Sequence, residues 1–311
     1  MHGSSLRGSS AKLTAACAAA VLLSLSIPPA EAGSELGSQR VGTSSGVFLK
    51  VPIDARSSAM AGATTSSISG PAAMFVNPAG LGLEHDRAAL LSGIRYVADI
   101  PMGATAIALP IRRLGGSLGL AISGVFAEMD ETDEYHPLGT GRSFSYSAWA
   151  LAVGFSRPLT DKLSCGASVK LFSENLATEI GGTSLMPVML DAGAIYYVGY
   201  RDARIGIAIN NFGPDLRPAG QYTSRRTGSE MRYGSFSPPT LFRFGFSIDP
   251  VQSEHIRTLM SIDMGHLADN QEAIRLAGEA ILEDHFVVRA GYDFSADAFK
   301  FNGGFGALMA V

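Results

Sequence analysis

After residue 87 the sequence alternates between large apolar side chains and small ones. In residues 241–249, LFRFGFSID, the three phenylalanines and an isoleucine share one parity, while Arg, Gly, Ser and Asp share the other. A period of two is typical of β-strands, because successive side chains of a strand point to opposite faces. The same pattern recurs at 114–127, 204–210 and 286–294. An all-β architecture is therefore expected after residue 87.

The composition of the second face separates two kinds of all-β protein. A soluble sandwich usually carries Lys, Glu and Thr on its outward face. Here the face opposite the large apolar residues is dominated by Gly, Ala and Ser, as expected for a lumen filled by another part of the chain. This composition favours a membrane barrel with its large apolar residues in contact with lipid.

The lengths of the connections support the same class. We expect twelve strands, at residues 87–98, 101–111, 115–127, 143–156, 163–174, 187–199, 204–212, 239–249, 256–265, 272–282, 285–295 and 298–309. Connections after even-numbered strands are short, whereas those after odd-numbered strands include long ones at 128–142, 174–186 and 213–238. Outer-membrane barrels alternate short periplasmic turns with long external loops. The predicted fold is a transmembrane outer-membrane β-barrel.

The N-terminus predicts export. Residues 1–32 have the form of a signal peptide, with Arg7 and Lys12 before an apolar run and small Ala30 and Ala32 at its end. A linker at 33–46 would follow, and the predicted location is the bacterial outer membrane. The excess of 28 acidic over 24 basic residues argues against a nucleic-acid partner. Cys165, the single cysteine after the signal, falls on the large apolar parity and is expected to face lipid.

Residues 47–86 are expected to form a plug inside the barrel, with the wall at 87–311. The segment is rich in Ala, Ser and Gly, which permit close backbone packing. Its one rigid corner is Asn77, Pro78, Ala79 and Gly80: Pro78 suits a first helical position, and the Asn77 side chain can cap it. We expect this corner to direct the chain from the plug to the wall.

Charged residues in the predicted strands fall on the small-residue face. A basic residue facing lipid at mid-bilayer costs about 2–4 kcal/mol, so these charges should face the lumen. They are Arg243, Asp249, Asp263, Arg275, Glu279, Arg289, Asp293 and Lys300. They could form a ladder that guides ions or substrate, but mutual neutralisation in a packed lumen is favoured.

Two predicted external loops have unusual compositions. In the loop from Gly213 to Pro238, basic residues are interleaved with aromatic ones: Arg217, Arg225, Arg226, Arg232, Tyr222, Tyr233 and Phe236. This mixture suits a protein contact or lipopolysaccharide phosphates, and ordinary solvation explains it equally well. The acidic run at 128–136 could hold a divalent cation that bridges to lipopolysaccharide or attract a basic partner, although solvated charge runs are commoner.

A family resemblance agrees with the barrel. Residues 48–81, FLKVPIDARSSAMAGATTSSISGPAAMFVNPAGL, resemble the N-terminal signature of the PorV/PorQ outer-membrane proteins, which are related to the long-chain fatty-acid transporters. LDAGAIYY at 190–197, INNFGP at 209–214 and PPTLFRFGF at 238–246 are further matches. The resemblance implies 14 strands and, for some members, a role in type IX secretion, where they carry exported cargo to the surface-attachment machinery.

The sequence departs from that family in three places. ISGPAA at 68–73 replaces a usual acidic pair, and Val76 stands where an aromatic residue often precedes Asn77. The C-terminus, FNGGFGALMAV, lacks the usual final aromatic residue. Twelve strands are two fewer than 14, so we expect two further C-terminal strands to be missing from this sequence, although an even barrel of twelve is physically allowed.

No enzymatic chemistry is apparent. The histidines after the signal are scattered over turns, loops and strand ends, and neither a phosphate-binding loop nor a metal-ligand spacing occurs. We therefore predict no catalytic residue, metal or cofactor. Two functions remain: a binding and shuttle component for exported proteins, as the resemblance implies, or a channel for hydrophobic small molecules that is gated by the plug.

Overall fold

The fold was analysed in a computed structural model, which describes residues 44–132, 134–178, 183–218, 220–223, 228–268 and 271–309. The predicted signal peptide and most of the predicted linker lie outside the described residues. All elements below belong to a single compact unit.

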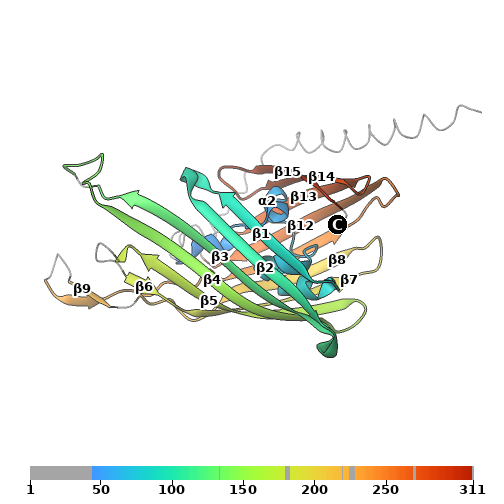
Figure 1. The fold of residues 1–311 in the computed structure, drawn as a ribbon, viewed down its shortest axis with the longest axis horizontal. Coiled ribbons are helices and arrows are strands. Elements are labelled where there is room, and N and C mark those ends of the chain that lie inside the picture. Colours follow the sequence, from blue (N-terminus) through green and yellow to red (C-terminus); the bar gives the residue numbers. More distant parts are fainter. Residues whose placement is uncertain are drawn as a thin grey trace, which may run out of the picture. The chain divides into compact units, whose positions relative to one another are not determined.

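The described chain forms one large antiparallel sheet, in which strands adjacent in sequence are adjacent in space (Figure 1). Its main path has twelve strands: β1 (Ala88–Arg95), β2 (Pro101–Ile111), β3 (Gly116–Asp130), β4 (Ser143–Pro158), β5 (Leu163–Leu176), β7 (Val188–Tyr197), β8 (Arg204–Phe212), β11 (Leu241–Ile248), β12 (Ile256–Leu267), β13 (Ala273–Leu282), β14 (Phe286–Asp293) and β15 (Phe301–Ala307). Each overlaps one predicted strand. The predicted class and order of strands are confirmed.

The smaller elements lie in the connections. β6 (Thr183–Leu185) pairs with β5, and the connection from β8 to β11 contains a separate hairpin of β9 (Gln221–Thr223) and β10 (Glu230–Arg232). Single 3-10 turns, η5 (Val97–Asp99) and η6 (Arg112–Leu114), join β1 to β2 and β2 to β3. In the described part of the chain the main path begins at β1 and ends at β15.

The two faces of the sheet differ as the alternation predicted. On β4, Leu151 is 42% exposed and Val153 46%, whereas Ala150 and Ala152 between them are 3% and 4% exposed. The buried face is covered by the plug and the exposed face is apolar. A large exposed apolar surface of this kind is unstable in water and suits hydrocarbon.

The plug consists of short helical turns that lie against the small-residue face of the sheet (Figure 1). They are η2 (Val47–Lys50), α2 (Ala55–Ala59), η3 (Gly70–Ala72), α3 (Ala73–Val76) and η4 (Pro78–Leu83). η4 contacts β4, β5 and β7, α2 contacts β14 and β15, and η3 contacts β1 and β2. The plug thus contacts both ends of the strand path. Within the described residues no helix has the length and apolarity to cross a membrane.

The difference between the faces predicts how the sheet responds to an added charge. Leu151→Arg places a cation on the exposed face at the middle of β4 and should lower the free energy of unfolding in lipid vesicles by about 2–4 kcal/mol. The control Leu159→Arg, just beyond the end of β4, should cost at most about 1 kcal/mol. Urea unfolding followed by fluorescence of Trp149, the single tryptophan, measures both. Equal costs would contradict a bilayer around this face.

Candidate functional site

The Asn77 corner joins the plug to the wall. Asn77 is fully buried and precedes Pro78 at the start of η4. Its Oδ1 accepts a hydrogen bond from the Ala79 backbone N–H at 3.1 Å. Its Nδ2 donates to the carbonyl oxygens of Thr65 at 2.9 Å and Ala194 at 3.3 Å. One side chain therefore caps a helical turn, joins two parts of the plug and attaches them to β7.

The wall facing this corner has no side chain that could hold the plug away. A Cβ added at Gly193 would lie 2.0 Å from Asn77 Oδ1, and one at Gly166 would lie 2.5 Å from the Pro78 carbonyl. Real Cβ atoms do not approach so closely, so both positions require glycine. Other wall glycines whose added Cβ would lie within 3.0 Å of the plug are Gly119, Gly154, Gly206, Gly245, Gly291 and Gly304.

The remaining corner residues are held by the wall and by the plug itself. The Ala79 carbonyl accepts hydrogen bonds from Ser156 Oγ at 2.9 Å and Ser164 Oγ at 2.7 Å. A Cβ at Gly80 would lie 2.3 Å from the Ile68 carbonyl oxygen, so Gly80 is required by a close approach within the plug. The corner begins η4, the last helical turn of the plug before β1, and is seated against β4, β5 and β7. That it directs the chain from the plug to the wall stays a prediction.

Six of the eight charges that were expected to face the lumen lie on the inner face of the sheet; they are Arg243, Asp263, Arg275, Glu279, Arg289 and Asp293. Arg275 Nε lies 2.8 Å from Asp293 Oδ2, and Glu279 Oε2 lies 2.5 Å from Arg289 Nε. Asp263, like Arg243, is buried, and it accepts a hydrogen bond from the Thr65 N–H of the plug at 2.9 Å. These pairings connect neighbouring strands and the plug, as expected for mutual neutralisation.

One ion pair joins the plug to a strand that lies 223 residues later in the sequence. Arg56 on α2 donates to both oxygens of Glu279, through Nε at 3.0 Å and Nη2 at 3.1 Å. Glu279 is 9% exposed and is shared between this plug arginine and Arg289 on β14. Removal of one partner would leave a buried charge without its counter-ion, which is costly. This cluster therefore fixes α2 to the wall.

Of the two further charges expected on the inner face, Lys300 differs from the prediction. It lies exposed in the loop before β15, because that strand begins at Phe301, three residues later than predicted. Asp249 lies just beyond the end of β11, 3.7 Å from Arg204, and lines a cavity together with Glu279 and Arg289. Partial burial raises the pKa of the Asp249 carboxyl above its usual range, and this effect outweighs the opposing attraction of Arg204.

A bulge in β8 builds a polar cluster that the sequence analysis missed. The register between β7 and β8 shifts between Leu190 and Ala192, and both Asn210 and Asn211 are buried. Asn211 adopts a positive φ of 55°, and its N–H donates to Asp191 Oδ1 at 2.7 Å. β-Bulges re-aim side chains in this way and are common beside functional sites.

Lys170 on β5 completes the cluster. Its Nζ lies 3.0 Å from Asp191 Oδ2 and 2.5 Å from Asn211 Oδ1, while Ser168 Oγ donates to Asp191 at 2.9 Å. Lys170 and Asp191 both fall on the inward-facing parity of their strands. On β5 this is the small-residue parity, which was an available signal for Lys170. On β7 the same parity also carries Met189 and Ile195, so Asp191 had no such signal.

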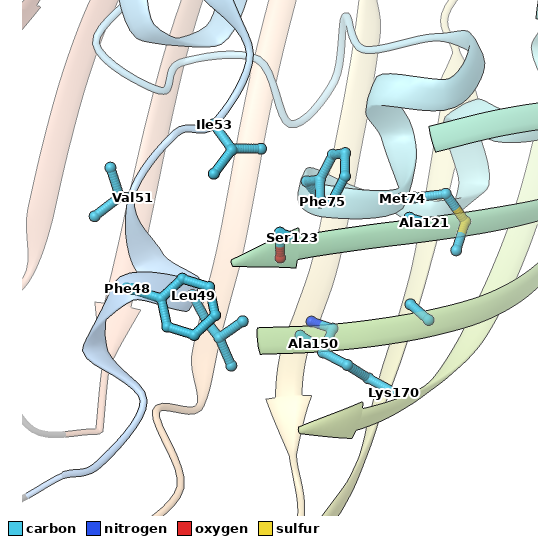
Figure 2. A pocket seen from close by; sticks show the side chains of 11 residues that line it. Phe48, Leu49, Val51, Ile53, Met74, Phe75, Ala121, Ser123, Ala150 and Lys170 are labelled. Atoms are coloured by element: carbon cyan, nitrogen blue, oxygen red, sulfur yellow. The ribbon is translucent and has the colours of Figure 1, made fainter. Parts of the chain in front are cut away.

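Lys170 also lines an apolar pocket (Figure 2). The pocket is lined by Phe48, Leu49, Val51, Ile53, Met74, Phe75, Ala121, Ser123, Ala150, Ala152 and Lys170. Figure 2 shows Phe48, Leu49 and Ile53 on one plug segment and Met74 and Phe75 on α3, all facing β3 and β4. Its free volume is about 20 Å³, which is room for about one water molecule.

A second, larger cavity is lined in part by the same plug segments. Its volume is about 750 Å³, and its lining includes Asp54, Ala72, Arg204, Asp249 and Leu308. Wall residues in this lining lie near the short turns of the sheet. Ile53 and Met74 of the apolar pocket are one and two residues from Asp54 and Ala72, so the same two plug segments line both spaces.

The predicted external-loop contacts are placed in part. Tyr222 in β9 and Tyr233 just after β10 have ring centroids 5.2 Å apart. Arg225 and Arg226 lie outside the described residues. Among the residues that are described, no group of three or more His, Cys, Asp or Glu side chains is arranged to hold a metal ion. Cys165 lies on the outward parity of β5, partly exposed.

Comparison with known proteins finds similar folds among solved structures and no match among protein families or curated proteins. No protein-family model matches the sequence, and no curated protein matches it either. Among solved structures, the Pseudomonas putida toluene transporter TodX is 14% identical, with a TM-score of 0.51 over 81% of this chain and 87% of that chain. The Ralstonia pickettii toluene transporter TbuX is 17% identical, with a TM-score of 0.50 over 82% and 89%.

These likenesses show that the fold is that of the outer-membrane hydrophobic-transporter barrels. At such identities they show the fold alone. A PorV/PorQ relationship is not supported by the comparisons, and neither is a role in type IX secretion.

The contact between Gly193 and Asn77 predicts a measurable loosening of the plug. Gly193→Ala should displace Asn77 and cost about 1–3 kcal/mol through overpacking. Trypsin should then cleave faster after Arg56, which is the only basic residue between Lys50 and Arg87.

The matched control is Gly278→Ala on β13, where an added Cβ would meet its nearest atom at 3.8 Å. This variant should be cleaved at the wild-type rate. Equal cleavage of the two variants would show that the close contact at Gly193 does not hold the plug.

Proposed function

We propose that the protein is a passive channel for hydrophobic small molecules in the bacterial outer membrane, with the plug as its gate. The observation that carries the proposal is the arrangement of the two spaces. An apolar pocket and a cavity of about 750 Å³ are both lined by the same plug segments, around residues 53–54 and 72–74. Displacement of the plug would join them into one path.

The composition of the pocket supports a hydrophobic solute. Nine of its eleven lining residues are apolar, and ligand pockets of this kind bind apolar molecules with a few polar groups that orient them. At about 20 Å³ the pocket is much smaller than the roughly 300 Å³ that small-molecule sites usually provide. A solute therefore requires movement of the plug, and the structure represents the closed state of the proposed gate.

The similar folds are consistent with this proposal, since two of them are described as toluene transporters. The shuttle function that the family resemblance implied stays a prediction. Its candidate contact surface includes Arg225 and Arg226, which are not described, and the stacked pair Tyr222 and Tyr233 alone does not favour it. The proposal assigns no catalytic residue and no cofactor.

Uptake by cells tests the channel directly. Expression of the full chain in a host that lacks its own hydrophobic-solute channels should accelerate the entry of radiolabelled toluene or oleate over an empty-vector control. The two probes cover neutral and carboxylate solutes. If neither enters faster, the proposal is wrong.

Locking the plug tests the gate. A Cβ added at Gly304 on β15 would lie 2.7 Å from the Cβ of Ala59 on α2. Since disulfides join Cβ atoms about 3.8 Å apart, A59C and G304C together should form one after a shift of about 1 Å. Oxidation should abolish uptake, and a reductant should restore it.

The controls are the variants that carry A59C alone or G304C alone beside the native Cys165, whose uptake should not respond to oxidation, and a gel or mass measurement of the cross-link. Uptake that continues at the full rate in the cross-linked protein would show that α2 does not need to move.

A further inference from the structure

The apolar pocket contains one ionisable side chain, and that side chain is already neutralised. Among the described residues that line the pocket, only Lys170 can carry a charge. Its side chain is 9% exposed, and that of its partner Asp191 is fully buried. The ammonium also donates to Asn211 Oδ1 at 2.5 Å. The ammonium of Lys170 is therefore already paired with protein acceptors.

The counter-charge is held rigidly. Asp191 Oδ1 accepts from the Asn211 N–H at 2.7 Å and from Lys170 at 3.2 Å, and its other oxygen accepts from Ser168 Oγ at 2.9 Å. A ligand carboxylate would have to displace a buried carboxylate that is hydrogen-bonded on both oxygens. It would also have to lose its own hydration on entering apolar surroundings, which is costly for an ion.

A second buried carboxylate lies further along the inner face of β5. Glu174 is 3% exposed and accepts hydrogen bonds from Tyr146 Oη at 2.6 Å and from the Gly46 N–H at 3.4 Å. It is four residues beyond Lys170, which is about 13 Å along a strand, toward the long loops. An anion that approaches the pocket from that side meets this negative charge first.

The plug also carries a lysine next to the pocket residues in sequence. Lys50 stands between Leu49 and Val51 in the sequence, but it is not part of the pocket lining. Its ammonium donates to Ser44 Oγ at 3.4 Å.

We propose that the channel selects neutral apolar solutes, such as hydrocarbons and long-chain alcohols, and discriminates against carboxylates of the same length. The inference rests on the proposed function and deepens it. Its basis is the Lys170, Asp191 and Asn211 cluster, which withholds the only cation of the pocket from any ligand, together with the buried carboxylate of Glu174.

A matched pair of ligands tests the selectivity. The full chain in lipid nanodiscs is dialysed against radiolabelled 1-decanol or decanoate at pH 8, with empty nanodiscs subtracted. Decanol should bind saturably, and decanoate should bind at least about tenfold more weakly because its charge finds no partner. Decanoate binding as tight as that of decanol, or tighter, overturns the inference and leaves the channel function intact.

A substitution that releases the ammonium should shift the selectivity. Asp191→Asn keeps the shape of the side chain but removes the charge that neutralises Lys170, so decanoate affinity should rise about tenfold while decanol affinity changes little. Asp293→Asn, which removes a paired inner-face carboxylate outside the pocket lining, is the matched control and should leave the ratio unchanged. An unchanged ratio in a folded Asp191→Asn protein contradicts the role of the cluster.

Folding of Asp191→Asn is judged by its mobility on gels before and after boiling. If this variant does not fold, the comparison of decanol and decanoate binding by the wild-type protein tests the selectivity alone. Failure of wild type to bind either ligand, together with the absence of toluene and oleate uptake by cells, overturns this inference and the proposed function together.

Discussion

The plug can lie directly on the wall because the inner face of the wall has few large side chains. Gly166 and Gly193 allow the backbone and side chains of the Asn77 corner to approach within distances that a Cβ would forbid. The large residues are on the other face of the same strands, where hydrocarbon replaces a protein core. A shift of one residue in any strand would exchange the two sets. The alternation of large and small side chains therefore specifies the surface that contacts the membrane, the register of the strands and the surface on which the plug rests.

The plug is held differently on its two sides. Toward β12, β13 and β14 it is attached by directional bonds, from Arg56 to Glu279 and from the Thr65 N–H to Asp263. Toward β3 and β4 apolar contacts are added, with Met74 against the glycines of both strands, and Ser156 of β4 donates to the Ala79 carbonyl. Apolar contacts are individually weak and tolerate sliding better than paired charges. The apolar pocket is lined by Met74 and by residues of β3 and β4.

The strands and faces could be predicted from the sequence because alternation and connection length are local signals. The inner placement of charges such as Arg275 and Glu279 followed from the cost of a charge in lipid. The cluster around Lys170 could not be predicted in the same way. It depends on a bulge at Asn210 and Asn211, which interrupts the period, and on side-chain contacts that join three successive strands of the sheet. Local turn chemistry identified the Asn77 cap, but its attachment to Ala194 is a tertiary contact and was not foreseen.

The bonds of the plug also constrain how the molecule assembles. Asn77 is bonded to a residue 117 positions later in the chain, and Arg56 to one 223 positions later. The plug therefore lacks these binding partners until the strands that carry them have formed. Such distant contacts slow folding, because a long loop must close before they form. The plug must consequently remain unseated until the wall around it is nearly complete.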